Sequence, residues 1–134
     1  MFENFEYSPA LKFGLNAAIE EINNKGLGII ERDIKKKSIF FREKLECFSQ
    51  VIFYENKRLL SGINTFNIKG FRAKEIYNYL LSKNILCSIS TPESSVVYFK
   101  KKNLVELVRI SIHSYNTINE INYLIKCLID LIKK

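Results

Sequence analysis

The sequence predicts an α+β fold, in which a small, largely antiparallel sheet has helices packed on one face. Three observations support this prediction. Apolar residues recur at helical spacing in four segments, and short β-rich runs lie between the second and the last of them. The links between these runs are too short for the crossovers of a doubly wound parallel sheet. With 134 residues, 47% of them hydrophobic, residues 1–134 are expected to form a single domain with a sizeable core.

The first helix has clear start and stop signals. Ser8 and Pro9 suit the N-cap and the first helical position, and Gly26 is suited to end the helix. The first helix is expected to carry an apolar face made of Leu11, Leu15, Ala18 and Ile22.

Asn84 fits a left-handed cap after the third expected helix, residues 73–83. The expected helices cover residues 9–25, 29–48, 73–83 and 118–132.

The segments between the helices are expected to form the sheet. Gly62 interrupts one β-rich run, and a glycine at such a position indicates a close approach of two backbone segments. A solvated bend is expected at residues 100–103. The expected strands are 51–54, 59–68, 85–89, an edge strand over 94–99, and the first part of 107–117.

The stretch 107–117 brings a charged residue into a strand. Alternation separates an apolar face from a face that carries Arg109 and His113. After the strand, Thr117 and Glu120 have the spacing of a capping box that opens the last helix. The apolar face consists of Val108, Ile110 and Ile112. This arrangement is typical of a fold that presents a binding residue.

Arg109 and His113 are the candidate site residues, and each has two interpretations. An arginine among β-branched residues fits a carboxylate or phosphate that the guanidinium binds through two hydrogen bonds. Alternatively, Arg109 forms a salt bridge with Glu106 or with a neighbouring helix. His113 either contacts the same ligand or hydrogen-bonds a turn carbonyl, and its ligand role is the weaker candidate.

Composition and motif content exclude several classes of function. The formal charge of +7 comes mostly from lysine, 16 of 21 basic residues, without an aromatic-rich or helix-turn-helix pattern, so no nucleic-acid partner is expected. No apolar run has the length of a membrane span, and no metal site is expected from a single histidine and three scattered cysteines. Those cysteines are expected to be reduced in the cytoplasm. No P-loop, GxSxG or GxGxxG motif occurs.

Residues 109–121 resemble the closing motif of class V aminotransferase-fold, pyridoxal-phosphate-dependent enzymes. The shared features are Arg109, Ser111 and the run Tyr115-Asn116-Thr117 before an acidic helix start. This family includes cysteine desulfurases, selenocysteine lyases and isopenicillin-N-epimerase-like proteins. The similarity extends over segments 2–6, 13–18, 61–66 and 81–88, and 91–109 fits the epimerase-like branch. Essentially the whole chain resembles the C-terminal small domain of these enzymes, and this resemblance implies the same type of fold.

The resemblance also implies roles for residues. Arg109 matches the family arginine that grips the α-carboxylate of the substrate. Pyridoxal phosphate is implied for the complete family enzyme, in which a large domain holds it through a lysine in a Ser/His-Lys context. The one lysine that follows a serine or histidine is Lys83, after Ser82 at the end of an expected helix, and nothing in the sequence resembles that large domain. We therefore expect no cofactor-binding or catalytic residue in this chain and no catalysis by the chain alone.

A further departure concerns the desulfurase branch. Desulfurases place a nucleophilic cysteine in the loop before the arginine, whereas residues 91–106 contain none and Cys87 falls in the strand ahead. Two hypotheses result. The chain is the carboxylate-binding domain of a truncated or split enzyme, which acts on an amino acid once a separate large-domain chain completes it. Alternatively, it is a non-enzymatic module of that fold that forms homo-oligomers or binds a partner.

Overall fold

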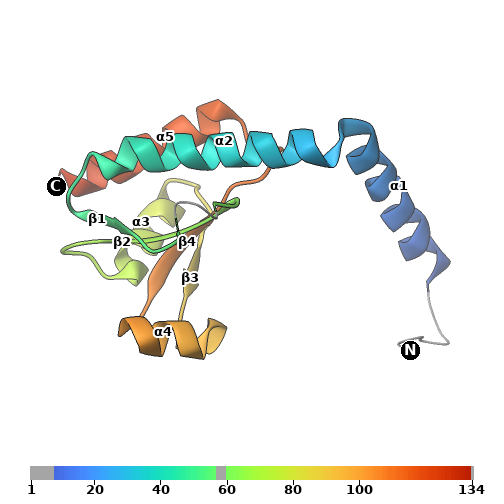
Figure 1. Cartoon of the computed structure of the whole chain (residues 1–134). Coiled ribbons are helices and arrows are strands. Elements are labelled where there is room, and N and C mark those ends of the chain that lie inside the picture. Colours follow the sequence, from blue (N-terminus) through green and yellow to red (C-terminus); the bar gives the residue numbers. More distant parts are fainter. Residues whose placement is uncertain (1–7, 57–59, 134) are drawn as a thin grey trace.

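The computed structural model describes residues 8–56 and 60–133 of the chain, and this part contains one sheet and several helices (Figure 1). The strands are β1 Val51–Phe53, β2 Ile63–Ile68, β3 Ser88–Ser90 and β4 Leu107–Ser111. The helices are α1 Pro9–Lys25, α2 Leu27–Glu46, α3 Ala73–Ser82, the short 3₁₀ turn η2 Pro92–Ser94, α4 Val96–Lys102 and α5 Ile118–Ile132.

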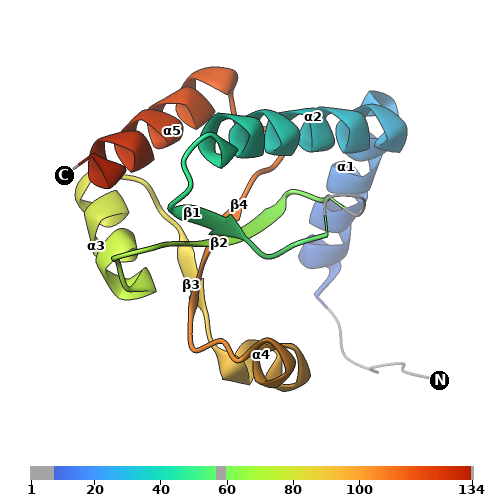
Figure 2. The same cartoon turned by 60° about the vertical axis from the view of Figure 1, so that its left-hand side comes forward.

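The sheet is antiparallel throughout, with the strand order β1-β2-β4-β3. Helices α2, α3 and α5 contribute buried residues to one core cluster together with β2 and β4 (Figure 2). Within residues 8–56 and 60–133, Figures 1 and 2 show no long helix over the opposite face of the sheet. The predicted fold class, an α+β arrangement with helices on one face, is therefore confirmed.

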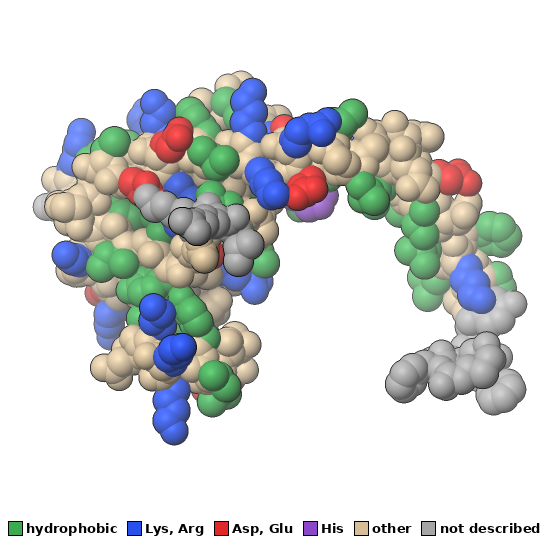
Figure 3. Space-filling model, in the orientation of Figure 1, with side chains coloured by type: hydrophobic (Ala, Val, Ile, Leu, Met, Phe, Trp, Pro, Cys, Tyr) green, Lys and Arg blue, Asp and Glu red, His purple; other side chains and the backbone are tan. Residues whose placement is uncertain are grey.

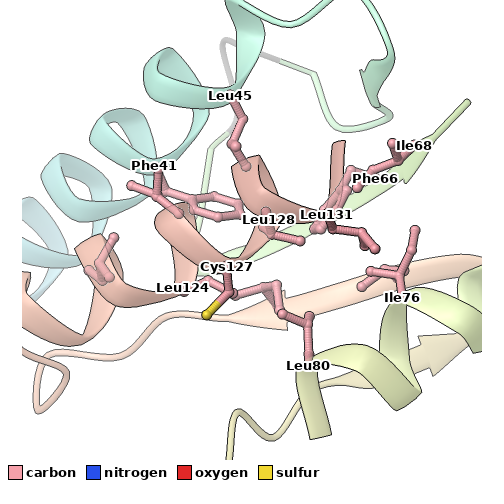
Figure 4. Packing of buried hydrophobic residues seen from close by; sticks show 14 of the residues in the cluster. Phe41, Leu45, Phe66, Ile68, Ile76, Leu80, Leu124, Cys127, Leu128 and Leu131 are labelled. Carbon is pink, nitrogen blue, oxygen red and sulfur yellow. The ribbon is translucent and has the colours of Figure 1, made fainter. Parts of the chain in front are cut away.

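Alternation along β2 explains how the core forms. The residues Asn64, Phe66 and Ile68 are buried, while those between them are partly exposed. The Phe66 ring lies 6.1 Å from the Phe41 ring of α2, in an edge-on arrangement. Figure 4 shows the aliphatic side chains that α3 and α5 add, among them Leu80 and Leu128. One continuous core thus fixes the position of β4 in the sheet.

Helix α1 begins and ends where the sequence predicts, but it stands apart from the core (Figure 1). Gly26, with a φ of 82°, lies between α1 and α2 and lets the chain change direction there. None of the α1 residues is buried, and Leu11 and Leu15 are 76% and 61% exposed. The apolar face expected for this helix therefore exists without a partner in the described part of the chain.

Two expectations about the strands are wrong. Residues 94–99 do not form an edge strand, because Pro92 starts η2 and the chain then forms α4, which ends at Asn103 in the left-handed conformation. Three lysines in its last turn suit the negative end of the helix dipole. In place of the expected solvated bend, residues 100–102 are helical.

The strand expected at 85–89 begins later, at Ser88. The reason lies in how α3 ends, with Asn84 in the left-handed conformation and the Ile85 amide donating to the Leu80 carbonyl. This confirms the predicted left-handed cap at Asn84. The same cap includes Ile85, which was expected to be the first residue of the strand. Strand β2 likewise begins at Ile63, and residue 59, the expected first residue, lies outside the described residues.

Gly62 marks the predicted close approach of two backbone segments. Its carbonyl accepts a 2.7 Å hydrogen bond from the Ile112 amide, which extends the β2–β4 pairing beyond β4. A Cβ atom at position 62 would lie 2.1 Å from the Ile112 carbonyl oxygen. Only glycine fits this contact without a shift of the backbone. This contact fixes the start of the loop that follows β4.

Candidate functional site

Arg109 lies on β4, on the sheet face opposite α2, α3 and α5. Its neighbours in the strand, Val108 and Ile110, are buried in the core, while Arg109 itself is exposed. The register pairs Arg109 with Thr65 of β2 on one side and with Ser88 of β3 on the other. Paired residues of antiparallel strands point to the same face, so Arg109 lies between two residues that carry hydroxyl groups, Thr65 and Ser88.

The predicted alternative for Arg109, a salt bridge to Glu106, is not formed. The Glu106 carboxylate instead accepts a 2.8 Å hydrogen bond from the Ala73 amide at the start of α3. Among residues 8–56 and 60–133, no ion pair or hydrogen bond engages the Arg109 side chain. A guanidinium with five N–H donors is therefore available to an external anion.

His113 follows the end of β4 and is exposed. Its ring stacks on Tyr115 at a centroid distance of 4.5 Å, and its Nδ1 atom lies 3.2 Å from the Ser114 hydroxyl. In the part that the structure describes, no hydrogen bond or ring contact joins His113 to Arg109. The side chain therefore forms part of the loop surface beside the arginine strand, and its role as a ligand contact stays a prediction.

The loop that carries His113 is held in place by local and distant contacts. The Asn116 side-chain oxygen accepts from the His113 amide at 2.9 Å, and the Asn116 amide donates to the His113 carbonyl at 3.1 Å. From α2, the Lys37 ammonium group donates to the Ser114 carbonyl at 3.0 Å and to Asp33 at 2.5 Å. These bonds fix the backbone between β4 and α5.

A small secondary cluster bounds the other end of the open sheet face. Leu107 and Phe99 are both buried, and they lie outside the main core cluster. The Tyr98 hydroxyl donates to the Tyr54 carbonyl at 2.9 Å, which ties α4 to the segment after β1. Figure 2 shows α4 at the far ends of β3 and β4. Arg109 thus lies between α4 and the 113–117 loop.

Cys87 lies on the opposite side of the sheet from Arg109. It packs against the core cluster, whereas the next residue, Ser88, pairs with Arg109 on the open face. Burial raises the pKa of the Cys87 thiol, which disfavours the reactive thiolate at neutral pH. This geometry indicates an inert thiol rather than a nucleophile at Cys87.

The buried lysine of the described residues does not suit a covalent link to pyridoxal phosphate. Lys37 is the one lysine buried among residues 8–56 and 60–133, and its ammonium group is engaged by Asp33 and the Ser114 carbonyl. A lysine held in this way is not free to form a covalent bond with a carbonyl group. No group of three potential metal-ligating side chains occurs in the same ranges. Within them, no helix is both long and apolar enough for a membrane crossing.

Thr65 and Ser88 are the residues at this site that sequence reasoning missed. Alternation along residues 63–68 places Thr65 on the face away from the core, and that signal was present in the sequence. The register that brings Thr65 beside Arg109 depends on pairing between two strands that are far apart in the sequence, which periodicity does not report. Ser88 was expected to lie in the strand 85–89. The amino-acid composition of that strand does not tell which other strand it pairs with, and the structure shows that it pairs with β4.

The aminotransferase class-V family matches residues 7–124 of the chain. A probable cysteine desulfurase from Borreliella burgdorferi is 31% identical over 123 residues, which are 90% of this chain and 29% of that protein. A probable cysteine desulfurase from Ureaplasma parvum is 26% identical over 87% of this chain and 28% of its own length.

Solved structures agree with these sequence matches. An apo cysteine desulfurase from Thermococcus onnurineus has a TM-score of 0.82 and 28% identity over 90% of this chain and 30% of its own. A cysteine desulfurase from Escherichia coli, at 15% identity and a TM-score of 0.80, shares the fold. The chain spans 28–30% of the length of these four proteins.

Proposed function

The chain belongs to the aminotransferase class-V family, and we propose that it is the substrate-carboxylate-binding part of a pyridoxal-phosphate enzyme of that family. Arg109 binds the α-carboxylate of an amino-acid substrate. The chain is not catalytic by itself, because the cofactor and its lysine belong to a domain outside these 134 residues. Pyridoxal phosphate, when bound there, stabilises negative charge next to the amino group of the substrate.

The observation that supports this role is the free guanidinium of Arg109 on the open face of the sheet. Arginine is a planar donor that matches the two oxygens of a carboxylate. A structural arginine behaves differently, as Arg42 shows: it is 3% exposed and donates to Glu55 at 3.0 Å. Arg109 lies on a central strand of the sheet and has no such partner among residues 8–56 and 60–133, which suits the binding of a small anion.

The exposed apolar face predicted for α1, to which the structure adds the exposed Ile19, is consistent with coverage by a partner domain. Figure 3 shows hydrophobic side chains along the uncovered length of this helix. A hollow at the junction of α1 and α2 joins the face to the Arg109 side of the molecule, since Ala18 and Ile22 line it together with His113 and Tyr115. A domain that covers α1 would therefore also reach the 113–117 loop, which follows β4.

Reconstitution tests the proposal. The chain is mixed with the part of the Borreliella burgdorferi relative that it does not match, and turnover of L-cysteine and L-alanine is measured with pyridoxal phosphate. We expect turnover only in the mixture, and a KM about tenfold or more higher for Arg109→Gln. Arg72→Gln, which removes an exposed arginine of the α3 cap, is the matched control and keeps the wild-type KM. A wild-type KM for Arg109→Gln would contradict the proposal.

The substrate class is an amino acid, and sulfur transfer is not part of the proposal. The names of the relatives make L-cysteine the first substrate to test. However, residues 91–106 contain no cysteine, and Cys87 faces the core. Cytoplasmic location stays a prediction.

The α1 apolar face also favours one alternative function, that of an oligomerising module. In that case two copies of the chain would cover each other's α1 helices. Light scattering after size exclusion at several concentrations distinguishes the two functions. If the chain self-associates and the added large-domain polypeptide does not disrupt this, the oligomerising module is favoured. If the chain instead forms a complex with the large-domain polypeptide, the enzyme is favoured.

A further inference from the structure

We infer that α1 is a docking helix whose folding is coupled to assembly, so that it becomes stable only when the cofactor-holding domain of the proposed enzyme covers its apolar face. This inference rests on the proposed function and extends it, because it assigns an interaction surface to that domain and a mechanism to their association. The surface, called here the α1 apolar face, consists of Leu11, Leu15, Ala18, Ile19 and Ile22.

The α1 apolar face loses contact with the rest of the chain along its length. The exposed fraction of the large side chains rises away from α2, from 41% and 46% to 61% and 76% at Ile22, Ile19, Leu15 and Leu11. Within residues 8–56 and 60–133, none of the 17 residues of α1 is buried. Most helices in proteins are stabilised by the packing of an apolar face, and isolated helices shorter than about 12–15 residues are marginal in water even when rich in alanine. Helix α1 is only slightly longer and lacks this packing.

Local interactions in α1 do not compensate for the missing packing. Ser8 is the N-cap residue, but its side chain makes no capping hydrogen bond. Asn16 donates to Glu20 at 2.7 Å and Lys25 donates to Glu21 at 2.5 Å, and such exposed pairs stabilise a helix only slightly. The helix also contains one glycine and three asparagines, which are poor helix formers. In the free chain, the helical conformation of α1 is therefore in equilibrium with unfolded ones.

Two observations favour the cofactor-holding domain over a second copy of the chain as the occupant of this surface. The chain spans 28–30% of the length of its relatives, so most of each relative has no counterpart in it. The hollow between α1 and α2 also joins the α1 apolar face to His113 and Tyr115, so one domain can cover all of them. A stable interface takes about 20–30 residues from each side, more than two α1 helices would supply if they covered only each other.

The first part of the test is amide hydrogen exchange of the full chain by itself. We expect the α1 amides to exchange at most about tenfold more slowly than those of an unstructured peptide, and the α5 amides at least about a thousandfold more slowly. Helix α5 is the internal control, because it has a capping box and a buried face. Protection of α1 equal to that of α5 would overturn the inference.

The second part repeats the measurement with the large-domain polypeptide used for reconstitution. We expect protection of the α1 amides to increase at least about tenfold in the complex, because docking removes the unfolded conformations. A complex in which α1 stays unprotected, or a failure of the two polypeptides to associate, would overturn the inference. Protection that instead rises with the concentration of the chain alone would make a second copy the occupant and overturn the named partner.

Two substitutions at one position test the coupling between folding and docking. Glu20 lies on the side of α1 away from the apolar face, and Glu20→Ala and Glu20→Gly both remove its hydrogen bond with Asn16. The two variants differ in helix propensity, so we expect Glu20→Ala to bind the large-domain polypeptide about threefold to fivefold more tightly in calorimetry. Equal affinities would show that α1 is fully formed before docking and would overturn the inference.

The matched control is the same pair of substitutions in α3. Asn78 is exposed there, and Asn78→Ala and Asn78→Gly should bind with equal dissociation constants, because α3 is already packed on the core. Should a substituted chain fail to fold, hydrogen exchange of the wild type decides. The proposed function is judged separately: a wild-type KM for Arg109→Gln would contradict the carboxylate role while α1 still gained protection in the complex.

Discussion

Arg42 and Arg109 show how two residues of the same type serve different purposes. Arg42 is buried, donates to the Glu55 carboxylate and carbonyl, and lies 4.4 Å from the centre of the Phe53 ring. Glu55 in turn accepts from the Thr65 amide, so the pair fastens the connection between β1 and β2. Arg109 takes part in no such network within the described residues, so we expect folding not to depend on it.

This contrast predicts effects on stability of very different size. Arg42→Met leaves the Glu55 carboxylate without its partner in a partly buried place, and we expect a loss of about 3 kcal/mol in the free energy of unfolding. Arg109→Met changes that free energy by less than about 0.5 kcal/mol, since an exposed side chain without a partner is removed. Urea denaturation of both variants measures the difference. Equal losses would show that Arg109 has a structural role.

Gly62 supports a second prediction at the level of single residues. Gly62→Ala places a Cβ atom against the Ile112 carbonyl, and the backbone shift required costs about 2 kcal/mol. Gly14→Ala is the control, because no heavy atom lies within 4 Å of a Cβ there and alanine favours a helix by about 0.5–1 kcal/mol. Thermal unfolding compares the two. A neutral Gly62→Ala would contradict the close contact.

At the level of elements, α5 was the most predictable part of the chain. The capping box and the apolar periodicity gave its bounds, and the structure confirms both, with the Thr117 hydroxyl accepting from the Glu120 amide at 3.2 Å. Segment 94–99 was predicted wrongly, because β-branched Val96 and Val97 indicate a strand while their position after Pro92 favours a helical turn. Local signals thus sufficed where caps were present.

The cap of α5 can be tested by substitution. Thr117→Ala removes the hydroxyl that accepts from Glu120 and should lower the free energy of unfolding by about 1 kcal/mol. Ser95→Ala is the matched control, since Ser95 is the N-cap of α4 but its side chain makes no capping hydrogen bond. Chemical denaturation reports both values. A loss for Ser95→Ala as large as that for Thr117→Ala would argue against the capping mechanism.

The same cap predicts a pH dependence. Hydrogen bonds from the Thr117 backbone and side chain hold the pKa of Glu120 below its ordinary value. The stabilisation is therefore complete above the unfolded pKa of about 4.3 and is lost as the pH falls through the folded pKa. Glu120→Gln removes this contribution, so its melting temperature should fall less steeply with acidification than that of the wild type. Parallel curves would contradict the assignment.

At the level of the whole molecule, the position of α1 is the feature that sequence reasoning could not supply. Periodicity predicted its apolar face, but periodicity cannot tell whether a face is covered by the same chain or by another. The open sheet face poses the same problem, because Thr65, Ser88 and Arg109 become neighbours only through strand pairing. Much of the local structure was predictable, whereas the open sheet face and the uncovered face of α1 could be seen only in the fold.

The exposed helix leads to a prediction about assembly. Replacing Leu15 and Ile19 together with glutamine should weaken the complex with the large-domain polypeptide at least about tenfold, since two apolar side chains would no longer be buried. Stability should change little, because neither residue is buried in the chain. Leu81→Gln, at an exposed position of α3, is the control. Isothermal titration calorimetry measures the affinities, and undiminished binding would exclude α1 from the interface.

The most direct test of the central claim compares two ligands on the reconstituted complex. L-alanine and ethylamine differ by the carboxylate, and their binding is followed through the absorbance of the cofactor. We predict that loss of the carboxylate weakens binding about a hundredfold in the wild type and no more than about threefold in Arg109→Gln. An equal loss in both proteins would contradict the account, because it would show that Arg109 does not bind the carboxylate.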